Sequence, residues 1–385
     1  MRKYVIVRRS SAVRSTDRTR GFEKGVEPAG PIAYERLTDR DAASIAADPD
    51  VEAVAPAMPV KLIQPLASSA SVGEEVWGLD AVGALKSGFT GRDVTVAVLD
   101  TGIDASHPAF AGMDVEQRDF SGDGDGDRQG HGTHCAGTIF GRDVDGIRIG
   151  VAPGVKRALI AKVLGDGGGG DSEMIVEGIN WAVSRGANVI SMSLGFDFPG
   201  LVASWIDENW PVELATSNAL EAYRVNLRAF DAIMNLTKAR GGLGGGALVI
   251  AASGNESRRD EHPDWRIAAS LPAAAEDVVS VAAVGRDGGR LSVAGFSNSM
   301  ALVSAPGVDV LSAQVGGGLR SLSGTSMACP HVAGVAALWW EQIRRSGRTP
   351  TPTNVRAALI DKARREPFED GYFEADFGQG LVTAP

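Results

Sequence analysis

Buried strands that alternate with helices are the feature that most limits how this chain can fold. Residues 91–102 begin with a Gly-Arg-Asp turn and continue as an almost unbroken apolar run that ends at Asp100 and a Thr-Gly pair. Such a run is typical of a strand that is covered on both faces of a parallel sheet. A helix is predicted at 172–184, and further strands are predicted at 158–164, 189–194, 247–252 and 278–284. The alternation predicts an α/β fold, in which right-handed crossovers place helices on both faces of a mainly parallel central sheet.

The composition excludes several classes of protein. The 38 basic and 48 acidic residues give a net charge of −10, so nucleic acid is not an expected partner. No apolar run approaches the ~20 residues of a membrane-spanning helix, so no membrane partner is expected. The basic N-terminal end precedes an apolar stretch too short for a signal peptide, which favours a cytoplasmic location over a secreted form that has lost its signal. Two cysteines, Cys135 and Cys329, define no disulfide framework. A disulfide between them requires their Cα atoms to lie close together, and the sequence does not give that distance.

Residues 1–70 are predicted to form a small α+β unit, and residues 71–385 the main domain. A small, polar run at 67–71 lies between them and is a candidate linker and cleavage site. The predicted elements of the first unit are a strand at 4–7, a helix that is capped by Thr38 and runs to Ala47, and a strand at 51–54.

Ser326 lies at the start of a run of small residues, 327–337, that can pack closely as a helix. We expect Pro330 to lie among the first four residues of this helix, where the missing N–H costs nothing. Free backbone N–H groups and the positive end of the helix dipole would then stand beside the serine hydroxyl. Ser326 is therefore either a nucleophile beside oxyanion donors or an ordinary helix cap.

Three further polar residues lie at the ends of predicted elements. Asp100 ends a buried strand, where open α/β sheets place ligands, although an aspartate there can also cap the next element. His131 starts a helix of small residues and is a candidate general base; together with Cys135 it is also a candidate pair of metal ligands on one helical face. Asn255 follows a predicted strand, where its amide can donate to an oxyanion or simply form a turn.

Together these four sites resemble the motifs of the subtilisin family of serine peptidases. The aspartate motif is similar to residues 98–102 (VLDTG), the histidine motif to 131–134 (HGTH), the oxyanion motif to 253–255 (SGN) and the serine motif to 324–328 (GTSMA). The order Asp, His, Ser along the chain separates this family from other hydrolases with the same triad. The resemblance extends from Trp77 to the C-terminus and implies a three-layer, subtilisin-like α/β fold.

The resemblance also implies a role for each residue. Ser326 attacks the peptide carbonyl to form an acyl-enzyme, His131 passes the proton to the leaving amine, and Asp100 holds the imidazole tautomer. Asn255 and the backbone N–H of Ser326 receive the oxyanion. The expected activity is that of a serine endopeptidase that acts on a peptide or protein and requires no cofactor for its chemistry. The alternatives are a processing protease of narrow specificity and a silent subtilase that only binds peptides.

Segments that match the family imply the substrate contacts. Residues 271–273 resemble a segment with a cis proline. The implied contacts are Ser193, Leu194 and Gly195 on one wall of the primary pocket, Ala252, Ser253 and Gly254 on its other wall, Gly168, Gly169 and Gly170 along an extended substrate, and Ile175 and Leu194 in a second, apolar pocket.

The chain departs from the family pattern in two places. Ala109 follows His-Pro where the family's tight calcium site has an aspartate, whereas Asp123, Asp125 and Asp127 alternate with glycines elsewhere. These three aspartates are either a structural calcium site or a solvated acidic loop. Residues 196–246 are predicted to form an enlarged helical insertion, which is a packed surface helix, a lid or a surface for a partner.

The N-terminal unit resembles an inhibitory propeptide. Residues 42–54 carry this likeness, and residues 61–65 (KLIQP) resemble the short blocking segment of intracellular subtilisins. The chain is therefore expected to be a zymogen whose own N-terminal segment is the inhibitor, with residues 62–67 across the active site. Leu62 or Leu66 is expected to fill the second apolar pocket.

Overall fold

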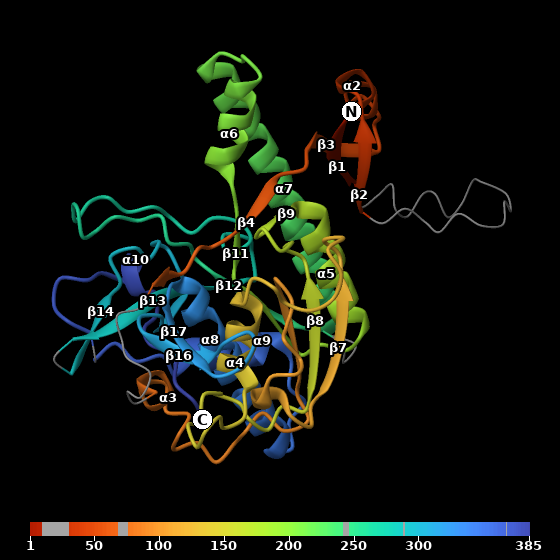
Figure 1. Cartoon of the computed structure of the whole chain (residues 1–385). Coiled ribbons are helices and arrows are strands. Elements are labelled where there is room, and N and C mark those ends of the chain that lie inside the picture. Colours follow the sequence, from red (N-terminus) through yellow and green to blue (C-terminus); the bar gives the residue numbers. More distant parts are fainter. Residues whose placement is uncertain (10–30, 68–75, 242–245, 288, 367) are drawn as a thin grey trace, which may run out of the picture.

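The computed structural model describes residues 1–9, 31–67, 76–241, 246–287, 289–366 and 368–385 (Figure 1). Its central sheet consists of β6 (Thr95–Asp100), β7 (Asp114–Asp119), β8 (Arg157–Lys162), β10 (Val189–Met192), β12 (Leu248–Ala252), β13 (Val279–Asp287), β14 (Arg290–Val293) and β15 (Val303–Pro306). The order is β14-β13-β12-β10-β6-β8-β7, with β15 paired to β13, and every pairing is parallel except that of β13 with β14. The predicted parallel sheet is confirmed. Strand β7 was not predicted, because this partly exposed edge strand has a mainly polar sequence.

Helices cover both faces of the sheet, as the alternation predicts. Within β6, Val96 and Val98 belong to one buried cluster, whereas Ala97 and Leu99 belong to another. Because successive side chains of a strand point to opposite faces, the two clusters are the two interfaces of a three-layer fold. The first interface is formed with α4 (His131–Phe140), α8 (Thr325–Arg345) and α9 (Pro352–Asp361), and the second with α5 (Ser172–Ser184) and α7 (Val212–Gly241).

A small antiparallel sheet at the N-terminus packs on the second helical layer. Its order is β2-β1-β3, from β1 (Arg2–Arg8), β2 (Ile32–Leu37) and β3 (Val51–Pro56), and α2 (Asp39–Ala46) precedes β3. The predicted helix cap is confirmed, since Thr38 Oγ1 accepts the N–H of Asp41 at 3.2 Å. Strand β2 lies in a stretch for which no strand was predicted. Val5, Val7 and Ala55 are buried in the same cluster as α5 and α7, so this sheet covers apolar surface of the main domain.

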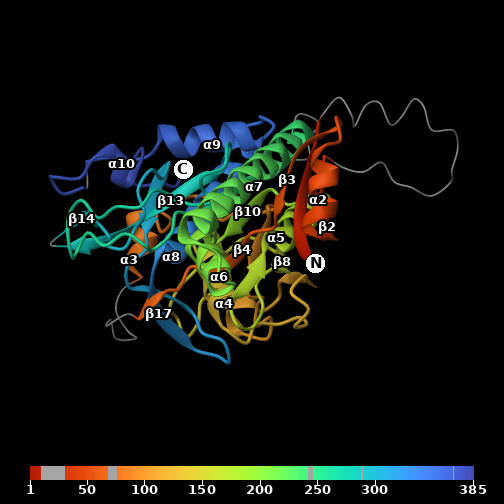
Figure 2. The ribbon, with the colours of Figure 1, turned by 90° about the horizontal axis from the view of Figure 1, so that it is seen from above.

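The insertion forms two helices, α6 (Phe198–Asp207) and α7, which contact each other. Figure 1 shows α6 and the adjoining end of α7 projecting from the body, and Figure 2 shows α7 running beside β3. Asn226 of α7 donates to the Pro56 carbonyl at 3.1 Å, and Arg2 pairs with Glu208 just beyond α6. The insertion therefore packs against the N-terminal sheet, which agrees with a packed surface helix.

Two smaller sheets hold the segment that follows the N-terminal unit. Strand β4 (Pro59–Leu62) lies between β11 (Leu194–Phe196) and β9 (Gly169–Asp171), antiparallel to both. Beyond it, β5 (Leu66–Ala67) pairs with β17 (Leu319–Ser323), which pairs with β16 (Val310–Ala313). The predicted linker at 67–71 lies almost wholly outside the described residues.

The remaining elements are short. They are α3 (Trp77–Ala81), the 3-10 helix η1 (Pro108–Phe110) and α10 (Glu374–Phe377). The peptide bond between Leu271 and Pro272 is cis, as expected. Among the described residues, no helix is long and apolar enough to cross a membrane.

Candidate active site

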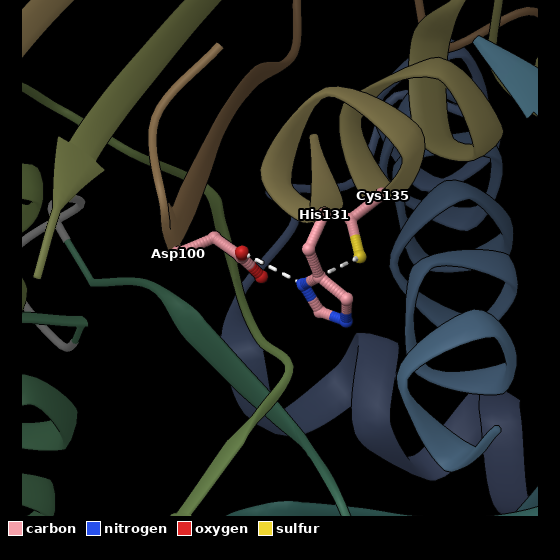
Figure 3. Close-up of side chains that lie close together, drawn as sticks. All are labelled: Asp100, His131 and Cys135. Atoms are coloured by element: carbon pink, nitrogen blue, oxygen red, sulfur yellow. Dashed lines mark hydrogen bonds and ion pairs between the residues drawn. The ribbon is translucent and has the colours of Figure 1, made fainter. Parts of the chain in front are cut away.

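Asp100 and His131 meet where β6 ends and α4 begins (Figure 3). Both side chains are buried, and the Nδ1–H of His131 donates to Asp100 Oδ1 over 2.8 Å. The close approach of α4 to the strand end requires Gly132, because a Cβ there would lie 2.2 Å from the carbonyl oxygen of Gly102. The bond to Asp100 holds the tautomer in which Nε2 is the free base. Among the described residues, Nε2 has no hydrogen-bond partner.

Cys135 lies one helical turn beyond His131, and its Sγ is 3.8 Å from Nδ1. Within the described part of the chain, Asp100, His131 and Cys135 are the one group of potential ligand atoms that lie within 4.8 Å of one another. The bond of 2.8 Å between Nδ1 and Oδ1 is too short for an ion held by both at about 2.0–2.2 Å in tetrahedral geometry. Burial raises the pKa of the Cys135 thiol well above its usual value, so it stays neutral. The geometry is that of a hydrogen-bond network, and both cysteines are free thiols.

Ser326 lies in the first turn of α8, as predicted, but Pro330 does not. The helix begins at Thr325, and Pro330 lies inside it beyond the first turn. The proline therefore removes the N–H that would bond to the carbonyl of Ser326. That carbonyl instead accepts the hydroxyl of Ser193 at 3.1 Å and the thiol of Cys135 at 3.4 Å. The proline thus frees a carbonyl that ties the start of α8 to α4 and to the loop after β10.

Asn255 follows β12 and points its amide N–H into the groove. Its Oδ1 accepts the backbone N–H of Thr325 at 2.9 Å and the Thr325 hydroxyl at 2.8 Å. These two bonds fix the orientation of the amide, so that Nδ2 faces the segment in the groove and donates to the Gln64 carbonyl at 3.0 Å. Asn255 is therefore a positioned donor beside Ser326, rather than only a turn residue.

The groove beside Ser326 is filled by the chain's own residues 59–67. Leu62, Lys61 and Val60 pair with Leu194, Gly195 and Phe196 on one side, and the Leu62 N–H donates to the Gly168 carbonyl at 2.8 Å on the other. This is the antiparallel pairing by which an extended peptide binds between two strands. Its register places the carbonyl of Ile63 next to the candidate nucleophile, because Ser326 Oγ donates to that oxygen at 3.2 Å.

The two halves of the site engage different carbonyls of this segment. Ser326 Oγ donates to Ile63 O, whereas Asn255 Nδ2, the candidate oxyanion donor, donates to Gln64 O. In a peptide that is hydrolysed, the carbonyl beside the serine hydroxyl and the carbonyl beside the oxyanion donor must be one and the same. His131 Nε2 is at the same time unpaired, so the serine hydroxyl is directed at the segment instead of the base. The geometry is that of an occupied groove in which attack on the segment is not aligned.

Five of the predicted substrate contacts lie beside this segment, namely Gly168, Gly169, Gly170, Leu194 and Gly195. Ile63 faces Gly195, where a Cβ would lie 3.5 Å from Ile63 Cγ1. Leu62 is 1% exposed and belongs to one cluster with Ile175 and Leu194, whereas Leu66 is 47% exposed. Leu62 is thus buried near the second pocket, and the alternative that Leu66 fills it is wrong. Among the predicted contacts, Gly168 lies before β9, Gly169 and Gly170 in β9, Ser193 before β11, Ala252 at the end of β12, and Ser253 and Gly254 in the loop that leads to Asn255.

The calcium interpretation of Asp123, Asp125 and Asp127 is not supported. The three carboxylates form no group of potential ligands among the described residues. Asp123 Oδ2 accepts the N–H of Asp166 at 2.8 Å. Asp127 is buried and already accepts several donors, including the N–H of Gly130 at 2.7 Å and the hydroxyl of Thr133 at 2.6 Å. These donors occupy the lone pairs that an ion would need.

Asp127 instead positions its neighbours, a role that the sequence analysis did not predict. Its carboxylate accepts N–H groups at the start of α4 and the hydroxyl of Thr101, which follows Asp100. It therefore links the start of the histidine helix to the end of the aspartate strand. An aspartate a few residues before a predicted helix is a capping signal, and that signal could have identified it.

Comparison with known proteins gives one consistent result. The profile described as the subtilase family matches residues 91–380. A subtilisin-like protease of Coccidioides posadasii is 35% identical over 278 residues, which are 68% of this chain and 58% of that protein. The major intracellular serine protease of Bacillus subtilis is 37% identical over 266 residues, which are 65% of this chain and 69% of that protein.

A solved structure is similar over nearly the whole chain. It is that of fervidolysin from Fervidobacterium pennivorans, described as a keratinolytic enzyme related to subtilisin, with a TM-score of 0.70 and 25% identity. The match covers 99% of this chain and 60% of that one. The chain thus spans little more than half the length of fervidolysin and of the Coccidioides protein.

Proposed function

The chain belongs to the subtilase family of serine peptidases, and from this premise we propose that it is a serine endopeptidase made as an autoinhibited precursor. Ser326 attacks the substrate carbonyl, and His131 takes the hydroxyl proton at Nε2 and returns it to the leaving amine. Asp100 holds the imidazole and stabilises its charged form, as the bond of 2.8 Å to Nδ1 allows. Asn255 Nδ2 and the Ser326 N–H receive the oxyanion. No cofactor takes part in these steps.

The observation that carries this proposal is the peptide strand at the nucleophile. Residues 59–62 pair with both rims of the groove, and the next carbonyl accepts the hydroxyl of Ser326. A groove that holds one extended segment in this way has the geometry to hold a substrate segment.

Autoinhibition is supported by how this segment is held. Ser326 is fully buried while the segment is in place. The N-terminal sheet that carries the segment is attached to the main domain through buried apolar residues and through Lys3, which pairs with Asp171 at 2.7 Å and also with Glu173. A segment that is preorganised by a docked unit loses less entropy on binding and inhibits better.

The name of one relative bears on where the enzyme acts. The Bacillus subtilis relative is named an intracellular protease. We therefore include action inside the cell in the proposal. Fractionation of the source organism, with an antibody to the chain, tests this part.

The test of the chemistry uses the full-length chain and a Ser326→Ala variant. We expect the wild-type chain, incubated until its activity is constant, to hydrolyse a peptide library and to be labelled by a fluorophosphonate, which reacts only with an activated serine. Loss of the nucleophile is expected to lower turnover by about 10⁶. A Ser326→Ala chain with a hundredth of wild-type activity would refute this assignment of the nucleophile.

A further inference from the structure

We propose that Asp197 makes the groove selective for a basic side chain on the acyl side of the scissile bond, two residues before the carbonyl that is attacked. This inference rests on the proposed peptidase activity. The segment in the groove supplies the observation, because Lys61 occupies this position relative to Ile63. Lys61 Nζ lies 2.9 Å from Asp197 Oδ1.

Strand pairing shows that Lys61 lies in the path of a substrate. Its backbone is opposite Gly195 on β11 and opposite Gly169 on β9. Asp197 directly follows β11, and its N–H donates to the Pro59 carbonyl at 2.9 Å. The residue that makes the ion pair is thus part of the rim that would pair with any bound peptide.

The carboxylate of Asp197 is bound by the main domain as well as by Lys61. Its Oδ1 also accepts the N–H of Gly200 at 3.1 Å, as the N-cap of α6. A Cβ at Gly200 would lie 2.1 Å from Asp197 Oδ2, so a glycine is needed for this fit. The side chain is 25% exposed. When Lys61 leaves, the negative charge therefore remains at the same place on the rim.

The surroundings also suit a cation. Asp171, on the opposite rim, lies across from Pro59 and pairs with Lys3 of the N-terminal sheet. A cavity of about 460 Å³ beside Asp171 and Asp197 is also bordered by Arg2 and Lys3 of the N-terminal sheet, so basic side chains of the chain itself already lie at this end of the groove. Removal of the N-terminal unit would take Lys3 and Lys61 away together, leaving this end of the groove with uncompensated acidic side chains.

The experiment measures kcat/KM on peptides that release a fluorescent amine after Val-X-Leu-Ile, where X is Lys, Arg, Gln or Glu. The enzyme is the full-length chain, incubated until its activity is constant. An ion pair with this exposure is expected to favour Lys over Gln by about two- to fivefold, with Glu cleaved more slowly than Gln. Asp197→Asn, which keeps an acceptor for Gly200, is expected to bring the Lys/Gln ratio to about one. Asp207→Asn is the matched control, because it removes an equal charge at the end of α6, away from the groove strand.

Two results would overturn the inference about Asp197. If the wild-type chain cleaves the Gln peptide as fast as the Lys peptide, the inference is wrong whatever the variants show. An unchanged Lys/Gln ratio in Asp197→Asn overturns it as well, and both results leave the peptidase activity in place. If no peptide of any sequence is hydrolysed, the proposed function itself is wrong, and the inference falls with it.

Discussion

Replacing Leu62 by alanine is expected to release the segment that fills the groove. The Leu62 side chain is 1% exposed and packs in one cluster with Ile175 and Leu194. Truncation of a buried leucine costs about 2–5 kcal/mol, and we expect a value of about 2–3 here because the backbone pairing of β4 remains. The cost falls on the docked state alone, since the released segment exposes residue 62 to water in both variants. The open fraction should therefore rise by about 30- to 150-fold.

The rate of fluorophosphonate labelling reports this change. Ser326 is fully buried under the docked segment, so the labelling rate follows the fraction of molecules in which the segment has left. Leu66→Ala is the matched control, because its side chain is 47% exposed and its truncation removes little packing. We expect Leu62→Ala to label about 30-fold faster or more, and Leu66→Ala to label at about the wild-type rate. Equal rates for the two variants would show that this packing does not hold the groove closed.

Two further predictions concern catalysis and stability. Asn255→Ala should lower turnover on a peptide by about 10²–10³, because one oxyanion donor is lost; unchanged steady-state turnover would contradict this role. Desolvation lowers the pKa of His134 to about 3 and that of His331 to about 4, so both stay neutral in the folded protein while the unfolded chain is protonated near its ordinary pKa of 6.5. Their neutral forms therefore support the fold above about pH 6.5, and the free energy of unfolding should fall as pH drops from there towards 4, by up to about 2.7 kcal/mol per pH unit. Urea midpoints that are equal at pH 7 and pH 5 would contradict this.

Local sequence patterns predicted five of the eight strands of the central sheet, four of the helices that cover it and the four candidate catalytic residues. The helix at 172–184 has the predicted bounds, and the strands before Asp100 and Asn255 end as expected. These features depend on burial, caps and turns within a single segment, so a pattern of neighbours in the sequence is sufficient to encode them. Strands β2 and β7 were missed because each lies at the edge of its sheet and depends on its partner strand, and the sequence of β7 is mainly polar.

Only the tertiary structure decided how these segments act on one another. Asp127 accepts an N–H group at the start of the histidine helix and the hydroxyl of Thr101 because the fold brings the end of β6 to the start of α4, and these donors occupy a carboxylate oxygen that calcium would need. Pro330 acquired a role because Ser193 and Cys135, from other elements, reach the carbonyl that it frees. Whether Leu62 or Leu66 is buried, and which carbonyl meets Asn255, depend on the register of β4 between β9 and β11. That register joins segments more than 100 residues apart, and its energy comes from contacts that exist only after the chain has folded.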